Sequence, residues 1–319
     1  MLDVIGFYTL TDKRAWRVSA STSPPLSRCE VLLSNRCNFR CPYCRRVGGP
    51  DADPIEVKRL LNYWIADGLA AVRFSGGEPT LWPALKETVV YAAKSIPRVA
   101  ISTNGSATTE EYNALLNAGA NDFSVSLDAC CAADGEKMNG GISGAWERVV
   151  ENIRFLSRHT YVTVGVVLTE SNQARLNDVV RFASRLGVDD IRIIPAAQAG
   201  ARLSVRELPA AGHPILQWRW ERLQNGLPVR GINAGDSPRC SLVLDDMAVM
   251  DGQHYPCIIY LREGGTPIGP VGPTMREDRR LWCESHRSDA DPICSRQCLD
   301  FCVAHNNRVR DFATLAALR

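Results

Sequence analysis

The sequence has little excess charge and no long apolar run, and these absences exclude several classes of protein. Its 319 residues hold 37 Lys and Arg against 35 Asp and Glu, a formal net charge of +2. So small an excess gives no field that would attract nucleic acid or an anionic membrane. No apolar run approaches the roughly eighteen residues of a membrane span, and residues 1–20 lack the apolar core of a signal peptide. We therefore expect a soluble, cytoplasmic protein with neither a membrane nor a nucleic acid as its partner.

Cysteine, by contrast, is abundant, with twelve in the chain. Cytoplasmic thiols stay reduced, so clustered cysteines there more often bind metal than form disulfides. One cluster lies near the start of the chain and a second near its end: Cys37, Cys41 and Cys44, then Cys240, Cys257, Cys283, Cys294, Cys298 and Cys302. The remaining three, Cys29, Cys130 and Cys131, are interpreted as small buried hydrophobes.

Short β-branched runs alternate with amphipathic stretches up to about residue 196. The expected strands are 29–34, 70–75, 98–103, 122–127, 161–168 and 190–195, and the expected helices between them are 55–66, 82–94, 109–118, 145–157 and 176–186. Strands that alternate with helices predict parallel pairing through right-handed crossovers. The fold class is therefore α/β, and periodicity leaves open whether the sheet is doubly wound or a partial barrel.

The pattern changes near residue 200, where we place a domain boundary. Residues 215–223 are expected to form a helix, and two alternating runs around Asp251-Gly252 predict a β-hairpin. The segment 262–292 is expected to be a loop, and residues 294–318 to be helical.

The first cysteine cluster has the spacing CxxxCxxC and follows the first expected strand directly. In parallel α/β folds, ligands gather at the carboxyl ends of the strands. Three thiolates can hold three irons of a [4Fe–4S] cluster and leave the fourth iron open. A structural zinc site would require a fourth ligand, and no Cys or His lies nearby in sequence. From the spacing alone, a metal site and an accident are about equally plausible.

The motif CNFRCPYC, with Tyr43 before its third cysteine, resembles the cluster motif of the radical S-adenosylmethionine (SAM) superfamily. The chain also carries SGGEP at residues 75–79, where that family binds the methionine part of S-adenosylmethionine. By this resemblance the carbonyls of Gly76 and Gly77 approach an ammonium group, Glu78 supplies the counter-charge, and Pro79 completes the motif. Asn104, in STNG, and Ser126 and Asp128, in SLD, stand where the family contacts the cosubstrate ribose or the substrate. Asp128 could equally well cap a helix.

The resemblance implies a fold and a chemistry. Residues 28–200 would form a partial (β/α)6 TIM-like barrel, after an N-terminal extension over residues 1–27. A [4Fe–4S] cluster, reduced by a donor such as flavodoxin or ferredoxin, would cleave S-adenosylmethionine to a 5′-deoxyadenosyl radical that abstracts hydrogen from the substrate. Substrate-facing side chains would lie at the strand ends, with Arg192, Glu170 and Gln198 as candidates.

The second cysteine cluster resembles the auxiliary-cluster extensions of this superfamily called twitch and SPASM. Cys240 and Cys257 bracket the expected hairpin as CX11GX4C. Two of Cys294, Cys298 and Cys302, four residues apart on one face if the segment is helical, would complete the ligands of one auxiliary [4Fe–4S] cluster. Residues 201–319 would then form a small auxiliary-cluster domain of hairpin and helix. Cys283 would be a fifth ligand, a buried thiol or a hydrogen-atom donor. A structural zinc site is the alternative.

The expected reaction is the oxidation or epimerisation of a small polar substrate, such as an aminoglycoside or aminocyclitol sugar, by an oxidoreductase or epimerase. Modification of a ribosomally made peptide is the alternative. Only 28 residues precede the first strand, which weighs against a built-in leader-peptide domain. A zinc-binding interaction module is the alternative of another class, but it would leave SGGEP unexplained.

Overall fold

A single mixed sheet organises the computed structural model, which describes residues 11–21, 26–45, 47–197 and 208–318. Among these residues the strand order is β6-β5-β4-β3-β2-β1-β7-β8-β9. The first six strands pair in parallel, each with the next along the chain: β1 (Arg28–Ser34), β2 (Ala71–Gly76), β3 (Arg98–Thr103), β4 (Asp122–Ser126), β5 (Tyr161–Leu168) and β6 (Asp190–Pro195). The sequence placed all six to within a residue or two.

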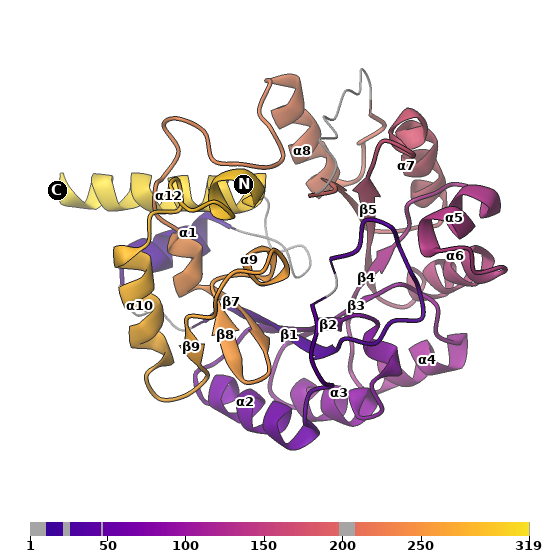
Figure 1. Ribbon diagram of the computed structural model, residues 1–319, viewed down its shortest axis with the longest axis horizontal. Helices are drawn as coiled ribbons and strands as arrows, with labels where there is room; N and C mark the ends of the chain where they lie inside the picture. Colours follow the sequence, from indigo (N-terminus) through magenta and orange to yellow (C-terminus); the bar gives the residue numbers. More distant parts are fainter. Residues whose placement is uncertain (1–10, 22–25, 46, 198–207, 319) are drawn as a thin grey trace.

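Helices between the strands cover the outer face of the curved sheet (Figure 1). They are α2 (Pro54–Ala66), α3 (Leu85–Ala93), α4 (Thr109–Asn117), α5 (Ala132–Asn139), α6 (Ala145–Leu156) and α7 (Leu176–Arg185). Their apolar faces and the outward side chains of the strands, such as Val31 and Ile193, form one large core. The six parallel strands follow one another in sequence order in an open sheet with the helices on one face (Figure 1), so the fold is an α/β partial barrel and not a doubly wound sheet, which periodicity left open. None of the helices in the described part of the chain is long and apolar enough to cross a membrane.

The predicted hairpin is confirmed, and it extends the barrel sheet. Strand β7 (Asp246–Met250) pairs in parallel with β1, and β8 (Gln253–Tyr255) returns antiparallel to it. The turn places Asp251 and Gly252 at positive φ, 50° and 70°, the conformation of a tight hairpin turn. A two-residue strand, β9 (Gly269–Pro270), completes the edge. The boundary near residue 200 lies within 198–207, outside the described residues, and the division into domains stays a prediction.

Two expectations for the carboxyl-terminal part were wrong. The segment 262–292 is not a loop throughout, because it contains α10 (Met275–Ser285). Its charge-rich sequence obscures the helical spacing of apolar residues, because one of the buried positions of the helix is Arg279. The guanidinium of Arg279 donates to the carbonyls of Val243 and Tyr255 at 2.8 and 3.2 Å. Buried arginine is tolerated where its donors are satisfied in this way.

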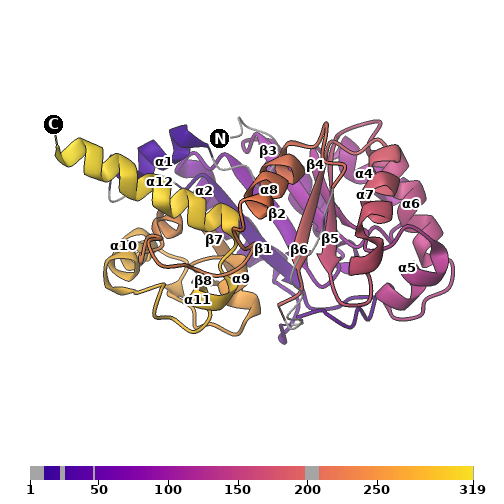
Figure 2. The same cartoon turned by 90° about the horizontal axis from the view of Figure 1, so that it is seen from above.

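The last helix is also interrupted. Helix α11 (Cys294–Gln297) ends at Cys298, and α12 (Asp300–Ala317) begins after Leu299. Cys298 and Leu299 are extended there, and this break bonds with another segment: the Gly231 amide donates to the Cys298 carbonyl at 2.9 Å, and the Asp300 amide donates to the Val229 carbonyl at 2.9 Å. Cys294, Cys298 and Cys302 therefore do not share one face of a continuous helix. Beyond this break, α12 packs on α1 (Asp12–Ser19) and projects from the body of the molecule (Figure 2).

A buried ion pair joins α12 to the end of the barrel. Arg219, in α8 (Pro214–Gln224), donates from Nε to Asp300 at 2.8 Å and also bonds the Ile193 carbonyl in β6. Both side chains are almost fully buried, and the guanidinium lies over the ring of Phe301. Removing either side chain of this pair would leave the other as an uncompensated buried charge.

We expect Arg219→Ala to lower the free energy of unfolding by about 3–5 kcal/mol, because Asp300 would stay buried without its cation. Arg308→Ala is the matched control, since it removes an ion pair to Asp12 whose side chains are 45% and 42% exposed; it should cost less than about 1 kcal/mol. Denaturant unfolding followed by circular dichroism measures both. Equal losses in the two variants would contradict the prediction.

Candidate functional site

The three cysteines that follow β1 line one cavity of about 340 Å³, a size typical of ligand sites. The cavity lies at the carboxyl ends of the parallel strands, the edge where the sequence placed it. The Sγ of Cys37 accepts from the amide of Phe39 at 3.4 Å and from Asn104 Nδ2 at 3.7 Å. Cys44 is exposed, whereas Cys37 and Cys41 are half-buried.

The electrostatics of these thiols fit a metal centre. Burial raises the pKa of the Cys41 thiol to about 12, and it also raises the pKa of Cys37. The neighbouring thiol Cys44 raises both further, so three thiolates so close together would be unstable without a cation among them. A bound metal removes such protons directly. The set of three soft sulfur donors suits iron–sulfur chemistry.

The glycine pair at the end of β2 packs against the cysteine loop. A Cβ on Gly76 would lie 2.2 Å from the Ser34 carbonyl oxygen, and a Cβ on Gly77 would lie 2.2 Å from the Arg36 carbonyl oxygen. The amide of Gly77 donates to Ser34 at 2.6 Å. Both glycines line the cavity. From the sequence, the carbonyls of these glycines are expected to approach an ammonium group. The structure shows in addition that the two backbones pack too closely for any side chain at either glycine.

Glu78 and Pro79 lie behind the cavity rather than along it. The Glu78 side chain is fully buried. It accepts from the Thr103 hydroxyl and the Asn104 amide, both at 2.7 Å, and from Thr80. Pro79 starts a short 3₁₀ turn. Neither is among the described residues that line the cavity. The hydrogen bonds of Glu78 instead join the ends of β2 and β3. Its role as a counter-charge stays a prediction.

The other predicted cosubstrate residues do meet at the cavity, which is lined by Tyr43, Asn104, Ser126 and Asp128. The Tyr43 hydroxyl donates to Asp128, whose second oxygen accepts from the Val167 amide at 2.5 Å. Burial raises the pKa of Asp128 to about 6. Asp128 is not a helix cap: α5 begins after Cys131 without a side-chain cap. The carboxylate instead ties the cysteine loop to β5.

Sequence reasoning missed several charged residues of this cavity. They come from the cysteine loop, the barrel interior and the carboxyl-terminal segment: Glu30, Arg45, Arg230, Arg262 and Glu263. Arg192 was a candidate and does line the cavity, whereas Glu170 is not among the lining residues and Gln198 lies outside the described residues. Glu30 was predictable in principle, since a charged residue inside a buried strand is unusual. The others depend on segments that are distant in sequence.

The carboxyl-terminal cysteines surround a second, smaller cavity of about 30 Å³. Five thiols line it, those of Cys240, Cys257, Cys294, Cys298 and Cys302. Burial raises the pKa of Cys240 to about 12 and also raises the pKa values of Cys257 and Cys294. Ile259 and Leu299 line both this cavity and the larger one. The two cysteine sites are therefore separated at that point by a single layer of side chains.

No three of these five thiols lie as close together as the ligands of one zinc ion would. Thiolates bound at about 2.3 Å in a tetrahedron would lie about 3.8 Å apart. In the described part of the chain, three ligand atoms within 4.8 Å of one another are found for His286, Asp291 and Cys294, and not for three cysteines. A larger group such as an iron–sulfur cluster fits this spacing better.

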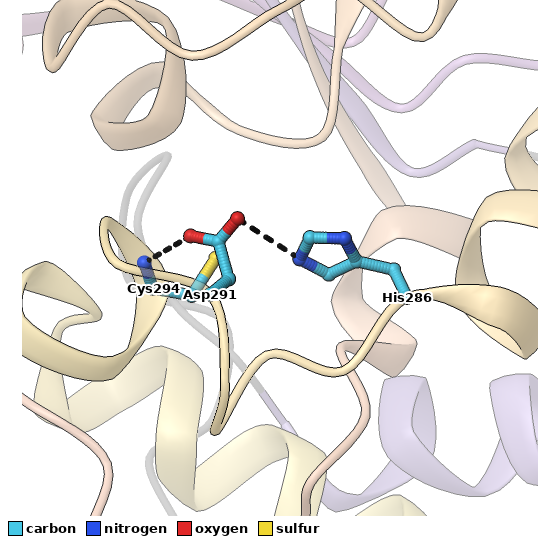
Figure 3. Close-up of side chains that lie close together, drawn as sticks. All are labelled: His286, Asp291 and Cys294. Atoms are coloured by element: carbon cyan, nitrogen blue, oxygen red, sulfur yellow. Dashed lines mark hydrogen bonds and ion pairs between the residues drawn. The ribbon is translucent and has the colours of Figure 1, made fainter.

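The group of His286, Asp291 and Cys294 is explained by hydrogen bonding. Figure 3 shows the Asp291 carboxylate between the His286 ring and the Cys294 amide. The carboxylate accepts from the amides of Ile293 and Cys294, both at 2.8 Å, at the start of α11. His286 lies 3.5 Å from it and stacks on Trp282. These contacts orient the segment that carries Cys294.

Cys283 does not join either group. It is buried in α10 and is not among the described residues that line either cavity. Its role as hydrogen-atom donor stays a prediction.

Comparisons with known proteins agree with this geometry. The sequence profile of the radical SAM superfamily matches residues 31–183. The GTP 3′,8-cyclase of Mycolicibacterium smegmatis is 41% identical over 113 residues, 32% of this chain and 31% of that protein. The enzyme of the same name from Synechococcus elongatus is 33% identical over 165 residues, 48% of this chain and 50% of that protein. The chain thus spans about a third to a half of these curated relatives.

Two solved structures share the fold. Streptococcus suis SuiB bound to the precursor peptide SuiA superposes with a TM-score of 0.60 at 14% identity, covering 91% of this chain and 79% of that one. Native anSMEcpe with bound AdoMet and a peptide superposes with a TM-score of 0.57 at 15% identity, covering 92% and 98%. At such identities the likeness concerns the fold. The sequence match, and not the likeness of fold, identifies residues 31–183 as a radical SAM superfamily domain, and the cysteine-lined cavity lies at the strand ends of that region.

Proposed function

We propose that the chain is a radical SAM enzyme in which Cys37, Cys41 and Cys44 hold a [4Fe–4S] cluster with one open iron. The observation that carries the proposal is the convergence of these three thiols with Gly76, Gly77 and Asn104 on one cavity within a radical SAM domain. When bound, the cluster and S-adenosylmethionine supply the 5′-deoxyadenosyl radical that abstracts a hydrogen atom from the substrate. The barrel wall excludes water from that radical.

A second part of the proposal concerns the carboxyl-terminal cysteines, which we assign to an auxiliary [4Fe–4S] cluster in a twitch-like segment over residues 201–319. Four of the five thiols around the second cavity would complete its ligands. Ile259 and Leu299, which line both cavities, bring such a cluster close to the substrate. An electron acceptor so placed suits a net oxidation, in which the substrate radical loses one electron and one proton. This favours an oxidoreductase over an epimerase.

The charges of the larger cavity bear on the substrate class. Among the described residues, four arginines line it against three carboxylates, and Arg45 is already paired with Glu263 at 3.0 Å. On the β6 side lie Arg192 and Arg230, the latter held by the Pro195 carbonyl at 2.9 Å. This arrangement favours a small anionic substrate over a polyamino sugar or a peptide. A purine nucleotide is the first candidate, because the curated relatives are named GTP 3′,8-cyclase.

The electron donor of the proposed enzyme would approach from the cysteine loop. Cys44 is the exposed member of its triplet, which places this edge of the first cluster nearest to the surface. A cytoplasmic flavodoxin or ferredoxin would suit this role, in a compartment that keeps the thiols reduced.

Cys37→Ala is expected to abolish S-adenosylmethionine cleavage, because two thiols cannot hold the cluster with a single open iron. The measurement is 5′-deoxyadenosine formation by the anaerobically reconstituted, reduced protein. Cys131→Ala is the control, since this cysteine lies outside both cavities, and it should cleave at the wild-type rate. Retained cleavage in Cys37→Ala would refute the assignment, and reconstituted wild type that held zinc but no iron would remove the whole proposal.

The double variant Cys240→Ser/Cys257→Ser separates the two cysteine sites. Its iron content should fall from about eight to about four per chain, because only the auxiliary cluster loses ligands. Cleavage of S-adenosylmethionine to 5′-deoxyadenosine should persist. Iron and sulfide analysis together with the cleavage assay test this. An unchanged iron content would contradict an auxiliary cluster held by these cysteines.

Arg192→Gln tests the substrate class. We expect the wild type, loaded with S-adenosylmethionine, to bind GTP and not the aminoglycoside neomycin. The variant should bind GTP about tenfold less tightly or worse, because one charge-assisted contact is lost. Arg185→Gln, on the outer helix α7, is the matched control. Tighter binding of neomycin than of GTP by the wild type would reverse the assignment.

A further inference from the structure

Glu30 is a buried carboxylate of the barrel interior that the proposed chemistry does not use. It lies in β1, where it is 5% exposed, and it lines the larger cavity. The Ser75 hydroxyl donates to its Oε1 at 2.7 Å. Within the described residues nothing donates a hydrogen bond to its Oε2. Because a buried carboxylate is costly unless its oxygens accept hydrogen bonds, a ligand that donates to Oε2 would stabilise it.

The other two carboxylates among the described lining residues of the larger cavity are engaged. Asp128 accepts hydrogen bonds through both of its oxygens, and Glu263 is paired with Arg45 at 3.0 Å. Glu30 differs from both of them. In the part of the chain that the structure describes, it has neither a cation paired with it nor a donor to its second oxygen. Glu30 is therefore the carboxylate of this cavity that is available to a substrate.

Glu30 also lines a third cavity, of about 60 Å³, which lies beside the larger one. Three apolar residues line both cavities: Ile258, Ile259 and Leu299. Arg28 lines the third cavity too, but it is paired with Asp246 at 2.8 Å. Arg219 is likewise paired with Asp300. The space beside Glu30 thus combines apolar walls with an acceptor, which suits a flat ring that carries hydrogen-bond donors on one edge.

A carboxylate distinguishes the two common purines by the edges of their rings. Guanine presents two adjacent donors, N1–H and the 2-amino group, which a carboxylate can accept as a bidentate pair. Adenine presents one amino donor beside the lone pair of its N1. That lone pair would face a carboxylate oxygen with no hydrogen between them. A good bidentate pair discriminates against the wrong base by about tenfold to a hundredfold.

We propose that Glu30 accepts hydrogen bonds from N1–H and the 2-amino group of a guanine ring, which lies against Ile259 of α9 (Ile258–Arg262) and against Leu299. The inference rests on the proposed function, which makes a purine nucleotide the substrate. Arg192 and Arg230, on the β6 side of the same cavity, would then bind the phosphates. Glu30 is thus a specificity residue in the first strand of the barrel, and it selects a guanine nucleotide over an adenine nucleotide.

The test compares the binding of GTP, ITP and ATP to the anaerobically reconstituted full chain loaded with S-adenosylmethionine. ITP keeps N1–H and lacks the 2-amino group. The wild type should bind GTP about tenfold or more tighter than ATP, with ITP between them. Glu30→Gln should bind GTP about tenfold less tightly and ATP at least as tightly as the wild type, because an amide offers one acceptor and one donor to the adenine edge.

Glu87→Gln is the matched control, since Glu87 is exposed on the outer helix α3. It should keep the wild-type order of affinities, and iron content and circular dichroism should be the same in all three proteins. An equal loss of GTP and ATP in Glu30→Gln would mean that Glu30 only shapes the cavity. Wild type that bound ATP as tightly as GTP would mean that no carboxylate recognises the ring. Either result overturns the inference while a purine nucleotide stays the substrate, whereas wild type that bound none of the three would refute the substrate of the proposed function.

Discussion

The close approach of two backbones at the end of β2 is the constraint on which the site depends. Gly76 and Gly77 bring their chain against Ser34 and Arg36, where any side chain at the glycines would meet a carbonyl oxygen at 2.2 Å. This contact lays the cysteine loop over the glycine motif and closes one side of the larger cavity. Larger residues here would displace Cys37 and its neighbours even if the barrel still folded.

Hydrogen bonds to two buried carboxylates also stabilise this region. Glu78 is buried and accepts from three residues, which joins the ends of β2 and β3. Asp128 joins the cysteine loop to β5 through Tyr43 and Val167. Because a buried carboxylate is costly unless its acceptor sites are used, these bonds hold the loops in one arrangement. The cavity is thus shaped before any ligand enters it.

Both cysteine groups share one electrostatic property. Burial raises the pKa of Cys41 in the first and of Cys240 in the second to about 12, so neither group favours thiolates without a cation. A cluster that deprotonates the thiols would relieve this cost, and its binding would contribute to folding. The shared wall formed by Ile259 and Leu299 makes the two sites neighbours in space, although about 200 residues separate them in sequence.

The sequence by itself determined the six parallel strands, the hairpin at Asp251-Gly252 and the two cysteine groups, because periodicity, turn residues and motif spacing are local properties. It placed Asn104, Ser126 and Asp128 at strand ends, and these residues do meet at the cavity. Local patterns could not show that α10 buries Arg279 or that the helix breaks at Cys298, since both depend on partners elsewhere in the chain. Only the tertiary structure placed Glu78 behind the cavity and brought Arg230 and Arg262 to its wall. Such contacts between segments far apart in sequence follow from how the carboxyl-terminal segment packs on the open barrel, which no local pattern encodes.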